Sequence, residues 1–450
     1  MSKILLDYQL AEKNALKVVK RTVKNCSAYK KVLKEKGFIV EKRKTIKDFP
    51  ILDKANYINR FSLVERVKKT KKLSSYYQFC TSSGSTGVPT IWPRDKRVDD
   101  SLEPLHTKLL DEHFQIKKKS SLIVVLFDLG TSTAGVMHAR LSWQANKYGN
   151  ISTITPGLDI KKACFLLSQL HFHYEQIIII GYPPLISDLV NYSKKQKCSL
   201  ERYNAGIVFA GGGASGHWRK QMAKSFNIKL NRIISFYGFS ESGMVGYETR
   251  DINRLLQYCI KYPKLNIELF DSFLLPTVIE TDFNKRFFEI ENDEIIVTVD
   301  QPIPLVRYNI HDKGKLIPVK EINQQLRQFG FKPCFNDKNR YLLVVYGREG
   351  KIFTPEEIAY ILEKTSLNIK LDQEFQYKIN QQNKTFILNL VVFRKELQLV
   401  SKSEKDKFIK EIGLLISKSK PDLKFKVKAD IQAHTKKQGY KSGKLCYFFN

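Results

Sequence analysis

Apolar and polar segments alternate along most of the chain, and the spacing of the apolar residues changes as the chain proceeds. In the first 75 or so residues, apolar side chains recur every three or four positions between lysines, which predicts basic helices. From Leu122 onward, short apolar strands alternate with helical stretches at 160–170, 184–197 and 216–225. The strands have the sequences SLIVVLF, EQIIIIG, YNAGIVFAGG and NRIISFYG. This alternation predicts an α/β sheet with crossover connections.

A second kind of pattern follows in residues 269–306. The segment FFEIENDEIIVTV alternates apolar runs with acidic turns and contains no long helix, so we expect an antiparallel β subdomain. After the apolar run 341–346 comes a turn-prone stretch, 347–351, and then a new set of helices and strands. We therefore place a domain boundary near residue 347. The fold class expected is α/β, a large N-terminal domain with α/β sheets and a β subdomain followed by a small α+β domain.

The charge balance limits the kinds of partner. Lys and Arg number 76 and Asp and Glu 45, a net charge of +31, which attracts phosphate-rich or acidic partners. The excess is mostly lysine, spread along the chain without an arginine-rich arm or a repeated basic-aromatic block. The sequence therefore does not favour a nucleic-acid partner, whereas an acidic protein partner stays open.

Cysteine usage and hydropathy bear on the compartment. The seven cysteines are scattered and form no C-x-x-C pair, which favours a reduced, cytoplasmic setting. The N-terminus has neither a continuous apolar stretch nor a small-residue cleavage site, and the longest apolar runs fall far below the roughly 20 residues of a membrane span. We expect neither a signal peptide nor a membrane anchor.

A hydroxyl-rich and glycine-rich loop is the strongest candidate for chemistry. Residues 81–90, TSSGSTGVPT, hold six hydroxyls and two glycines between two extended segments. Glycines let backbone N–H groups approach an anion, and the hydroxyls supply further donors, so we expect phosphate binding. A structural Ser/Thr loop is the alternative. The segment is not a Walker A loop, because no Lys follows Gly87.

Further candidates follow the ends of predicted strands, where ligands bind in α/β sheets. One is Tyr237-Gly-Phe-Ser240-Glu241, an aromatic ring, a hydroxyl and a carboxylate in one turn. A hydrolase elbow around Ser240 is a weak alternative, because Ser rather than Gly stands at 242. The glycines 211–213 begin a helix and suit a flat ring or a phosphate, or an ordinary turn. His171 and His173 alternate on a predicted strand, but without a second pair of ligands we expect no zinc.

Six segments in this order resemble the motifs of the adenylate-forming (acyl-AMP synthetase, AMP-binding) superfamily. They are SSGSTGVPT, AGGG, YGFSESG, PLVRYNIHDKG, YGREGKIFTPEEI and the terminal SGK. The resemblance covers essentially the whole chain and is nearest to phenylacetate-CoA ligases and their relatives in capsule or polysaccharide biosynthesis. It implies a large adenylation domain over residues 1–346, a hinge over 347–351 and a small mobile lid over 352–450.

The resemblance also implies which residues contact the nucleotide. The ATP phosphates would be held by Ser82, Ser83, Gly84, Ser85, Thr86 and Gly87. The adenine would be flanked by Gly211, Gly212, Gly213 and Tyr237, with Gly238 and Ser240 in the same turn. Asp312 would bind the ribose hydroxyls, and Arg348 would lie near the ribose or the phosphates. These roles suit a carboxylate acceptor and a guanidinium donor.

Two further residues would act in catalysis. Glu241 would help to hold Mg²⁺ on ATP, and Lys444 would correspond to the mobile lysine that neutralises charge as the carboxylate attacks the α-phosphate. Outside the resemblance, Asp312 also fits an ordinary turn, Arg348 a surface hinge and Lys444 one of many tail lysines.

Three positions depart from the family pattern. Val88 replaces the Lys often found after the loop, His311 replaces the Gly before the ribose-binding Asp, and Gly350 stands where many relatives have a hinge Asp. The first two bear on phosphate affinity and nucleotide fit, and the third bears on domain rotation. Glu241, Asp312 and Lys444 are retained.

The function predicted is ATP-dependent activation of a carboxylic acid through an acyl-adenylate, with release of pyrophosphate. The acyl group would then pass to a thiol, either CoA or the phosphopantetheine of an acidic carrier protein, in a reaction like that of phenylacetate-CoA ligase. The enzyme class expected is therefore an AMP-forming acid-thiol ligase. The alternative is a non-catalytic nucleotide-binding or nucleic-acid-binding protein on the same fold.

Overall fold

The computed structural model of the chain describes residues 3–82, 89–196, 199–272, 274–336, 340–347, 361–362, 365, 375–382, 385–394, 401–419 and 424–433. It divides into two compact units, residues 1–351 (the large unit) and 352–450 (the small unit). Among the described helices none is long and apolar enough to cross a membrane.

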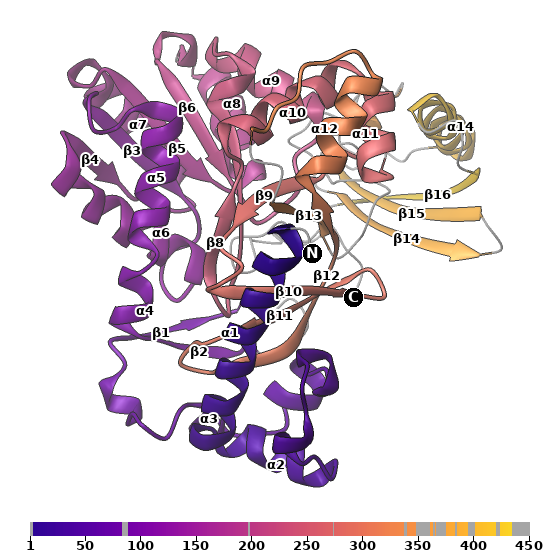
Figure 1. Ribbon diagram of the computed structural model, residues 1–450. Helices are drawn as coiled ribbons and strands as arrows, with labels where there is room; N and C mark the ends of the chain where they lie inside the picture. The colour runs from indigo at the N-terminus through magenta and orange to yellow at the C-terminus, as the bar shows by residue number, and fades with distance from the viewer. Residues whose placement is uncertain are drawn as a thin grey trace. The chain divides into compact units, whose positions relative to one another are not determined.

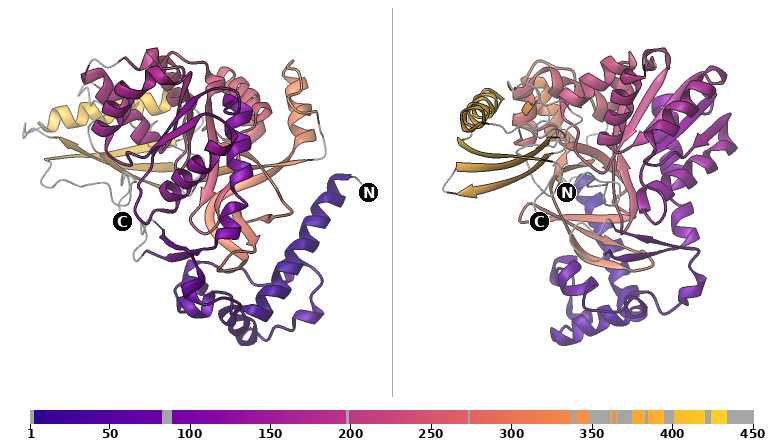
Figure 2. Two further views of the ribbon diagram at one scale, coloured as in Figure 1. Left: turned by 90° about the vertical axis from the view of Figure 1, so that its left-hand side faces the viewer. Right: turned by 180° about the vertical axis from the view of Figure 1, so that it is seen from behind.

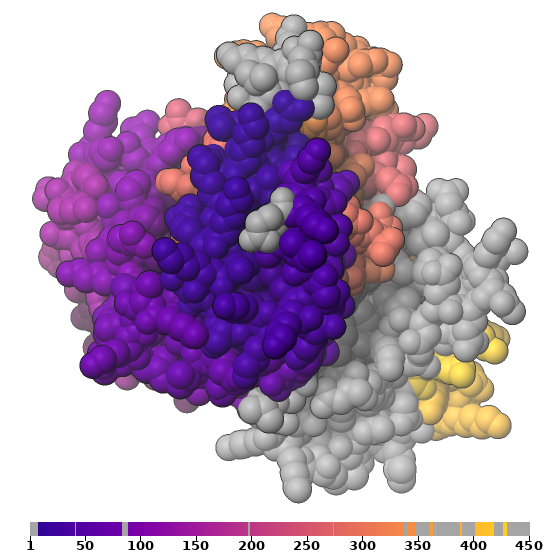
Figure 3. Space-filling view, turned by 60° about the horizontal axis from the view of Figure 1, so that its bottom comes forward, coloured from indigo at the N-terminus to yellow at the C-terminus, as the bar shows by residue number. Residues whose placement is uncertain are grey.

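The large unit begins with helices α1 (Lys3–Asn25), α2 (Ser27–Glu35) and α3 (Leu63–Arg66). Buried positions of α1 recur at helical spacing, as at Ala11, Ala15 and Val18, and this apolar face packs on strands of the sheet. Figures 1 and 2 show these helices gathered beside the antiparallel strands, and in Figure 3 their atoms form one broad face of the unit. The expected basic helices are present.

One continuous sheet of eleven strands runs through the large unit, in the order β10-β11-β12-β13-β9-β8-β7-β6-β5-β3-β4 (Figure 1). The parallel half consists of β3 (Ser121–Leu126), β4 (Ile151–Ile154), β5 (Gln176–Gly181), β6 (Ala205–Phe209) and β7 (Ile233–Phe239). The antiparallel half consists of β8 (Gly243–Tyr247), β9 (Thr277–Thr281), β10 (Arg286–Glu291), β11 (Glu294–Val299), β12 (Leu305–Pro318) and β13 (Tyr341–Gly347). The two halves meet where β8 turns back along β7.

Helices and a separate hairpin complete the large unit. The remaining α-helices are α4 (Lys96–Asp100), α5 (Glu103–Phe114), α6 (Thr133–Ala145), α7 (Ile160–Leu170), α8 (Pro183–Lys195), α9 (Gly216–Phe226), α10 (Arg250–Lys261), α11 (Pro263–Phe270) and α12 (Val319–Gln328). Single turns lie at Val40–Lys42, Ile46–Asp48, Lys54–Ile58, Leu73–Ser75, Asn146–Tyr148, His171–His173, Leu200–Arg202 and Leu230–Arg232. The hairpin pairs β1 (Gln78–Thr81) with β2 (Ile91–Arg94).

The α/β fold class is confirmed, with two differences in detail. The expected β subdomain is not a separate sheet, because β9 pairs with β8 and so continues the parallel half. The strand expected at His171 and His173 is wrong: both residues lie in a 3-10 turn at the end of α7, and the His171 ring nitrogen Nδ1 contacts the carbonyl of Leu167 at 2.9 Å. Alternating polar and apolar residues over only three positions fit such a turn as well as a strand.

The described part of the small unit includes a long helix and a sheet of three strands. Its sheet has the order β14-β15-β16, with β14 (Phe375–Gln382), β15 (Thr385–Arg394) and β16 (Lys424–Ala433). Helix α14 (Lys402–Ser419) connects the parallel strands β15 and β16. Its buried residues Phe408, Ile412 and Ile416 recur at every fourth position, which gives the helix one apolar face.

Candidate functional site

The carboxyl ends of three parallel strands, β3, β5 and β6, lie level at one edge of the large sheet, and β7 runs past them to Phe239. Leu126 of β3 is paired with Gly181 of β5, Gly181 with Phe209 of β6, and Phe209 with Ser235 of β7. Residues that follow these strands are therefore brought to the same edge, where α/β sheets bind ligands. The glycines 211–213 and the turn after Tyr237 are both placed there, as the sequence predicts.

The base of the hydroxyl-rich loop is fixed to this edge. The backbone N–H of Ser82 donates to the carbonyl of Thr90 at 3.0 Å, and the N–H of Thr90 donates to Ser82 Oγ at 2.9 Å. The N–H of Thr81 donates to the carbonyl of Thr131 at 2.8 Å, between β3 and α6. The expected flanking strands are present as β1 and β2. The Ser82 hydroxyl thus closes the base of the loop.

The turn between β7 and β8 depends on two glycines. A Cβ at Gly238 would lie 2.6 Å from the carbonyl oxygen of Gly243, and Gly243 has a φ of +74° with the Met137 sulfur 2.9 Å from the position of a Cβ. Because the strands approach so closely, the partly exposed Ser240 and Glu241 project from a narrow hairpin. The hairpin also rules out the hydrolase elbow, which needs a strand followed by a helix at the serine.

A hydrogen bond joins the two halves of the sheet at this turn. Tyr237 Oη donates to Asp312 Oδ2 at 2.5 Å, although the residues lie 75 positions apart. Tyr237 is 9% exposed on β7, while Asp312 is partly exposed on β12. The residues expected beside adenine and ribose are therefore neighbours in space.

His311, one of the departures from the family pattern, has a left-handed backbone. Its φ is +59°, and its N–H donates to Asn309 Oδ1 at 2.7 Å. A glycine would adopt this backbone without steric cost, which explains why the pattern has Gly here. The imidazole lies 3.6 Å from a carboxylate oxygen of Asp53 and 3.4 Å from one of Glu294. It therefore adds a contact between the N-terminal segment and the strand that carries Asp312.

Tyr182 is a site residue that the sequence analysis did not identify. It follows β5, is 8% exposed, and its ring lies 3.4 Å from a Cβ added at Gly211 and 3.1 Å from one at Gly212. Gly211 also has a φ of +85°. The two glycines therefore leave room for the tyrosine ring. An aromatic residue directly after an apolar strand, Gly181-Tyr182-Pro183, was the available signal.

Asp128 is a second residue near the site that the sequence analysis did not identify. It lies near the carboxyl end of β3, and burial raises the pKa of its carboxyl. The Asp128 carbonyl also lies 1.9 Å from the position of a Cβ at Gly135, so α6 can approach the strand only with glycine there. A carboxylate between an apolar strand and a helix was the signal in the sequence.

Two buried histidines lie between α5, α6 and the sheet. The rings of His106 and His138 are 5.3 Å apart, and His138 also contacts Phe127 and Phe236. Both side chains are 1% exposed, and their ring nitrogens have no hydrogen-bond partner among the described residues. Burial lowers the pKa of His106 to about 4 and the pKa of His138 well below its ordinary value, so both are neutral at pH 7.

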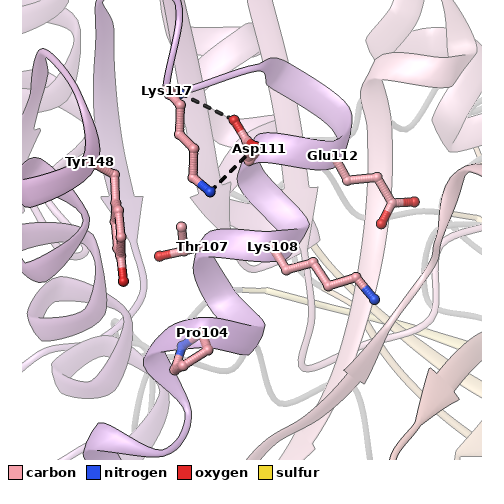
Figure 4. A pocket seen from close by; sticks show the side chains of 7 residues that line it. All are labelled: Pro104, Thr107, Lys108, Asp111, Glu112, Lys117 and Tyr148. Carbon is pink, nitrogen blue, oxygen red and sulfur yellow. Dashed lines mark hydrogen bonds and ion pairs between the residues drawn. The ribbon is translucent and has the colours of Figure 1, made fainter.

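A surface pocket of about 370 Å³ lies along α5 and contains none of the predicted site residues. Its lining is Pro104, Thr107, Lys108, Asp111, Glu112, Lys117 and Tyr148. Figure 4 shows Lys117 turned toward Asp111, with its ammonium 3.8 Å from a carboxylate oxygen. The cation is thus already directed to an acid of the protein itself.

Several predicted residues lie outside the described part of the chain. They are Ser83, Gly84, Ser85, Thr86, Gly87 and Val88 of the loop, Arg348 and Gly350 of the expected hinge, and Lys444. Within the described part no group of three His, Cys, Asp or Glu side chains is arranged to hold a metal ion.

Comparison with family models and with curated protein sequences finds no match. Solved structures match over nearly the whole length. 2-Hydroxyisobutyryl-CoA ligase in the postadenylation state with R3-HIB-AMP has a TM-score of 0.66 at 12% identity, covering 99% of this chain and 89% of that one. The same ligase with 2-HIB-AMP and CoA in the thioesterification state has a TM-score of 0.58 at 13% identity, covering 98% and 90%.

A third match is to the acyl acid amido synthetase AtGH3.15 in complex with 2,4-DB. The TM-score is 0.56 at 13% identity, and the match covers 99% of this chain and 92% of that one. A CoA ligase and an acyl acid amido synthetase thus share one architecture with this protein. These matches confirm the predicted resemblance at the level of the fold: the chain has the fold of the adenylate-forming superfamily.

Proposed function

We propose that the protein activates a carboxylic acid with ATP. The carboxylate oxygen attacks the α-phosphorus, a new P–O bond forms as the bond to the pyrophosphate breaks, and the products are an acyl-adenylate and pyrophosphate. In the second half, a thiol attacks the acyl carbon, AMP leaves, and the thiol proton passes to solvent or to a base. This division into two steps suits a mixed anhydride, which is an activated acyl donor.

The observation that carries the proposal is the hydrogen bond between Tyr237 and Asp312 at the carboxyl edge of the sheet. Adenosine needs a flat apolar surface for its base and an acceptor for its two ribose hydroxyls, and a tyrosine ring beside a carboxylate offers both. The glycines at 211–213 border the same edge, with the Tyr182 ring packed against them. A nucleotide lying along this edge would place its phosphates toward the loop whose base is held by Ser82 and Thr90.

Mg²⁺ fits the donor chemistry of the turn. Glu241 is a partly exposed carboxylate in the turn after β7, and Mg²⁺ prefers oxygen ligands that it shares with phosphate and water. Glu241 would hold the ion together with the ATP phosphates, and when bound the ion withdraws charge from the phosphoryl oxygens. The hydroxyls and N–H groups of residues 82–87 would bind the phosphates, and Lys444 would neutralise the charge that builds as the carboxylate attacks.

The domain roles belong to the same proposal. Residues 1–346 would form the adenylation domain, 347–351 the hinge and 352–450 the lid, whose rotation would exchange Lys444 for the acceptor channel. The acceptor proposed is CoA or a carrier phosphopantetheine, because a basic protein attracts the phosphates of CoA and an acidic carrier equally well. An aryl acid is the first substrate to test, in line with the resemblance to phenylacetate-CoA ligases.

The test is acid-dependent exchange of labelled pyrophosphate into ATP, with panels of aryl, short-chain and long-chain acids. Lys444→Ala should lower the exchange rate at least about 100-fold, and Asp312→Asn should raise the KM for ATP about tenfold or more. The matched controls are Lys441→Ala in the same tail and Asp293→Asn in an exposed turn, and both should leave the exchange rate unchanged. Incubation with acid, ATP and CoA, followed by mass spectrometry, identifies the acceptor.

The alternative function, a non-catalytic nucleotide-binding protein, predicts a different outcome. ATP would bind, Asp312→Asn would weaken that binding, and no acid would support exchange. Lys444→Ala would then change nothing. If an exchange-competent enzyme formed no thioester, the acceptor would instead be an amine, in line with the match to an acyl acid amido synthetase.

A further inference from the structure

The positive charge of the chain is concentrated at its N-terminal end. Residues 1–72 contain 21 Lys and Arg against 7 Asp and Glu, so they carry +14 of the net +31. Seventeen of these 21 cations are lysines. A sixth of the chain therefore contributes nearly half of its charge, and it contains none of the residues assigned to the nucleotide.

Helix α1 sorts this charge onto its outer side. Lys13, Lys17, Lys20 and Lys24 are spaced by four, three and four residues, so they form one stripe along the helix, and all four are exposed. The opposite side, which includes Ala11, Ala15 and Val19, is buried against the sheet. The apolar face of α1 is thus used within the protein, and only its basic face meets the surroundings.

The remaining cations of the segment are also mostly unneutralised. Seventeen Lys and Arg side chains of residues 8–72 are exposed, namely Lys13, Lys17, Lys20, Arg21, Lys24, Lys30, Lys31, Lys34, Lys36, Lys42, Arg43, Lys44, Lys47, Arg60, Lys69, Lys71 and Lys72. Four of them, Arg21, Lys31, Arg60 and Lys71, form ion pairs. The other thirteen make no ion pair with any described residue. Figure 3 shows the segment as a broad, continuous surface, to which we refer as the basic face.

The apolar side chains exposed on the basic face are aliphatic. They are Leu10 (50% exposed), Ile39 (49%), Ile51 (37%) and Val64 (64%). All six aromatic side chains of residues 8–72 are buried or partly buried. Single-stranded nucleic acid is bound by exposed aromatic rings together with Arg, and protein interfaces are enriched in Tyr, Trp and Arg and depleted in Lys. Lysine with scattered aliphatic residues instead matches the surface of proteins that lie on anionic membranes.

We propose that the basic face docks the protein on a membrane surface rich in anionic lipid. The lysines would lie in the potential of the headgroups, and Leu10, Ile39 and Val64 would reach the apolar boundary beneath them. Attraction of this kind needs no fixed geometry, so flexible lysines serve it as well as arginines would. The association is reversible and weakens with salt, because its range is one Debye length. It does not depend on the adenylation reaction.

The test is sedimentation of the full chain with vesicles of phosphatidylcholine alone and with about 30% phosphatidylserine. We expect binding to the anionic vesicles only, with loss as the salt concentration rises from about 0.05 to 0.5 M. Each lysine near an anionic surface contributes about a fivefold factor to the partition coefficient. Lys13→Glu, Lys17→Glu, Lys20→Glu and Lys24→Glu combined should therefore lower it at least about 100-fold.

The matched control changes the same net charge elsewhere. Lys161→Glu, Lys194→Glu, Lys220→Glu and Lys224→Glu combined lie at exposed positions of α7, α8 and α9. The fold decrease in the partition coefficient of this control should be less than about a fifth of that of the α1 variant. Both variants should keep the melting temperature of the wild type. Equal losses in the two variants would overturn the proposal, since net charge alone would then explain the binding. Binding to neutral vesicles at the same level, or tighter binding to single-stranded RNA than to the anionic vesicles, would overturn it too.

Discussion

Two buried arginine–glutamate pairs stabilise the two halves of the large sheet, and they are built differently. At the border of the parallel half, Arg219 of α9 donates to Glu248 with both terminal nitrogens, at 2.9 and 2.8 Å. Glu248 also accepts from the N–H and hydroxyl of Ser235 and from the amide of Asn253. In the antiparallel half, Arg307 reaches Glu289 through Nε alone, at 3.2 Å, and Glu289 Oε1 has no partner in the described structure.

The two carboxyl groups respond in opposite ways. Burial raises the pKa of Glu248, but Arg219 and the Ser235 donors outweigh it, so the net pKa lies below its ordinary value. For Glu289, burial outweighs the attraction of Arg307, and the net pKa is raised. Both side chains are nearly inaccessible to solvent, at 0% and 2% exposure. The number of donors, and not burial, therefore decides which carboxylate is held ionised.

The difference also concerns how the site is positioned. Glu248 directly follows β8 and bonds to Ser235, two residues before Tyr237, so it fixes the strand of the tyrosine. Arg307 lies five residues before Asp312 and donates to the carbonyls of Lys47 and Phe49. The strand of the aspartate is thus tied to the N-terminal segment by the less fully satisfied pair. We therefore expect the parallel half to be held in place more firmly than the antiparallel half.

Removing each arginine is the strongest way to test this comparison. Arg219→Met would leave Glu248 ionised and buried without a cation, which costs about 3–5 kcal/mol of unfolding free energy. Arg307→Met should cost less, about 2–3 kcal/mol, because Glu289 has a raised pKa and takes up a proton more readily. Urea unfolding at pH 7 measures both. If the two variants lost equal stability, the ranking of the two pairs would be wrong.

Acid should act first on the parallel half, through His106. Its pKa falls from 6.5 unfolded to about 4 folded, so the unfolded state binds the proton more tightly. The stability that the neutral ring preserves is complete above pH 6.5 and is lost progressively as the pH falls to 4, by about 3 kcal/mol. His106→Phe should lack this component. The measurement is unfolding free energy against pH for the two proteins, and parallel curves would contradict the prediction.

Much of the fold follows from local sequence. Strands β3, β5 and β6 are buried on both faces, so their apolar runs are continuous and easily recognised. The flanks of the hydroxyl-rich loop are strands, and α7 begins and ends at the expected residues. The union of the two halves into one sheet could not be foreseen, because β8 and β9 pair across an interval filled by α10 and α11.

In the candidate site too, the sequence indicated the individual residues but not the contacts between distant segments. The turn at Tyr237 and the carboxylate of Asp312 were both assigned to the nucleotide from their motifs, but no local pattern indicates that they form a hydrogen bond with each other. Arg307 illustrates the limit further, since it reaches backbone carbonyls about 260 positions away. His106 gave no signal either, because one polar residue among helix residues reads as solvent-facing until the packing of α6 is known.

Neutral substitutions of the two glutamates sharpen the comparison at lower cost. Glu248→Gln should destabilise by about 1–3 kcal/mol, because an amide NH₂ cannot accept from donors that now face it. Glu289→Gln should change stability by less than about 1 kcal/mol at pH 7.

The pH dependence of these two variants should also differ in sign. The contribution of Glu289 to stability is complete below pH 4.5 and is lost as the pH rises through its raised pKa. The stability of the wild type relative to Glu289→Gln should therefore increase as the pH falls. The contribution of Glu248 is present above pH 4.5 and is lost below it, so wild type there loses its advantage over Glu248→Gln. Thermal melts between about pH 3 and 8 measure both. Melting curves that shift in the same direction would show that the two pairs are equivalent.

A small effect should also come from the contact that joins the halves. Tyr237→Phe removes the hydroxyl that donates to Asp312 but keeps the ring, so the loss of stability should be about 0.5–1.5 kcal/mol. If the ring flanks adenine as proposed, ATP should bind less than about tenfold more weakly, because the variant keeps both the ring and the Asp312 carboxylate. Calorimetric titration with ATP, beside a thermal melt, separates these effects. A variant that lost ATP binding as completely as Asp312→Asn would show that the hydroxyl orients the carboxylate, so that the two halves of the sheet are coupled through this one bond.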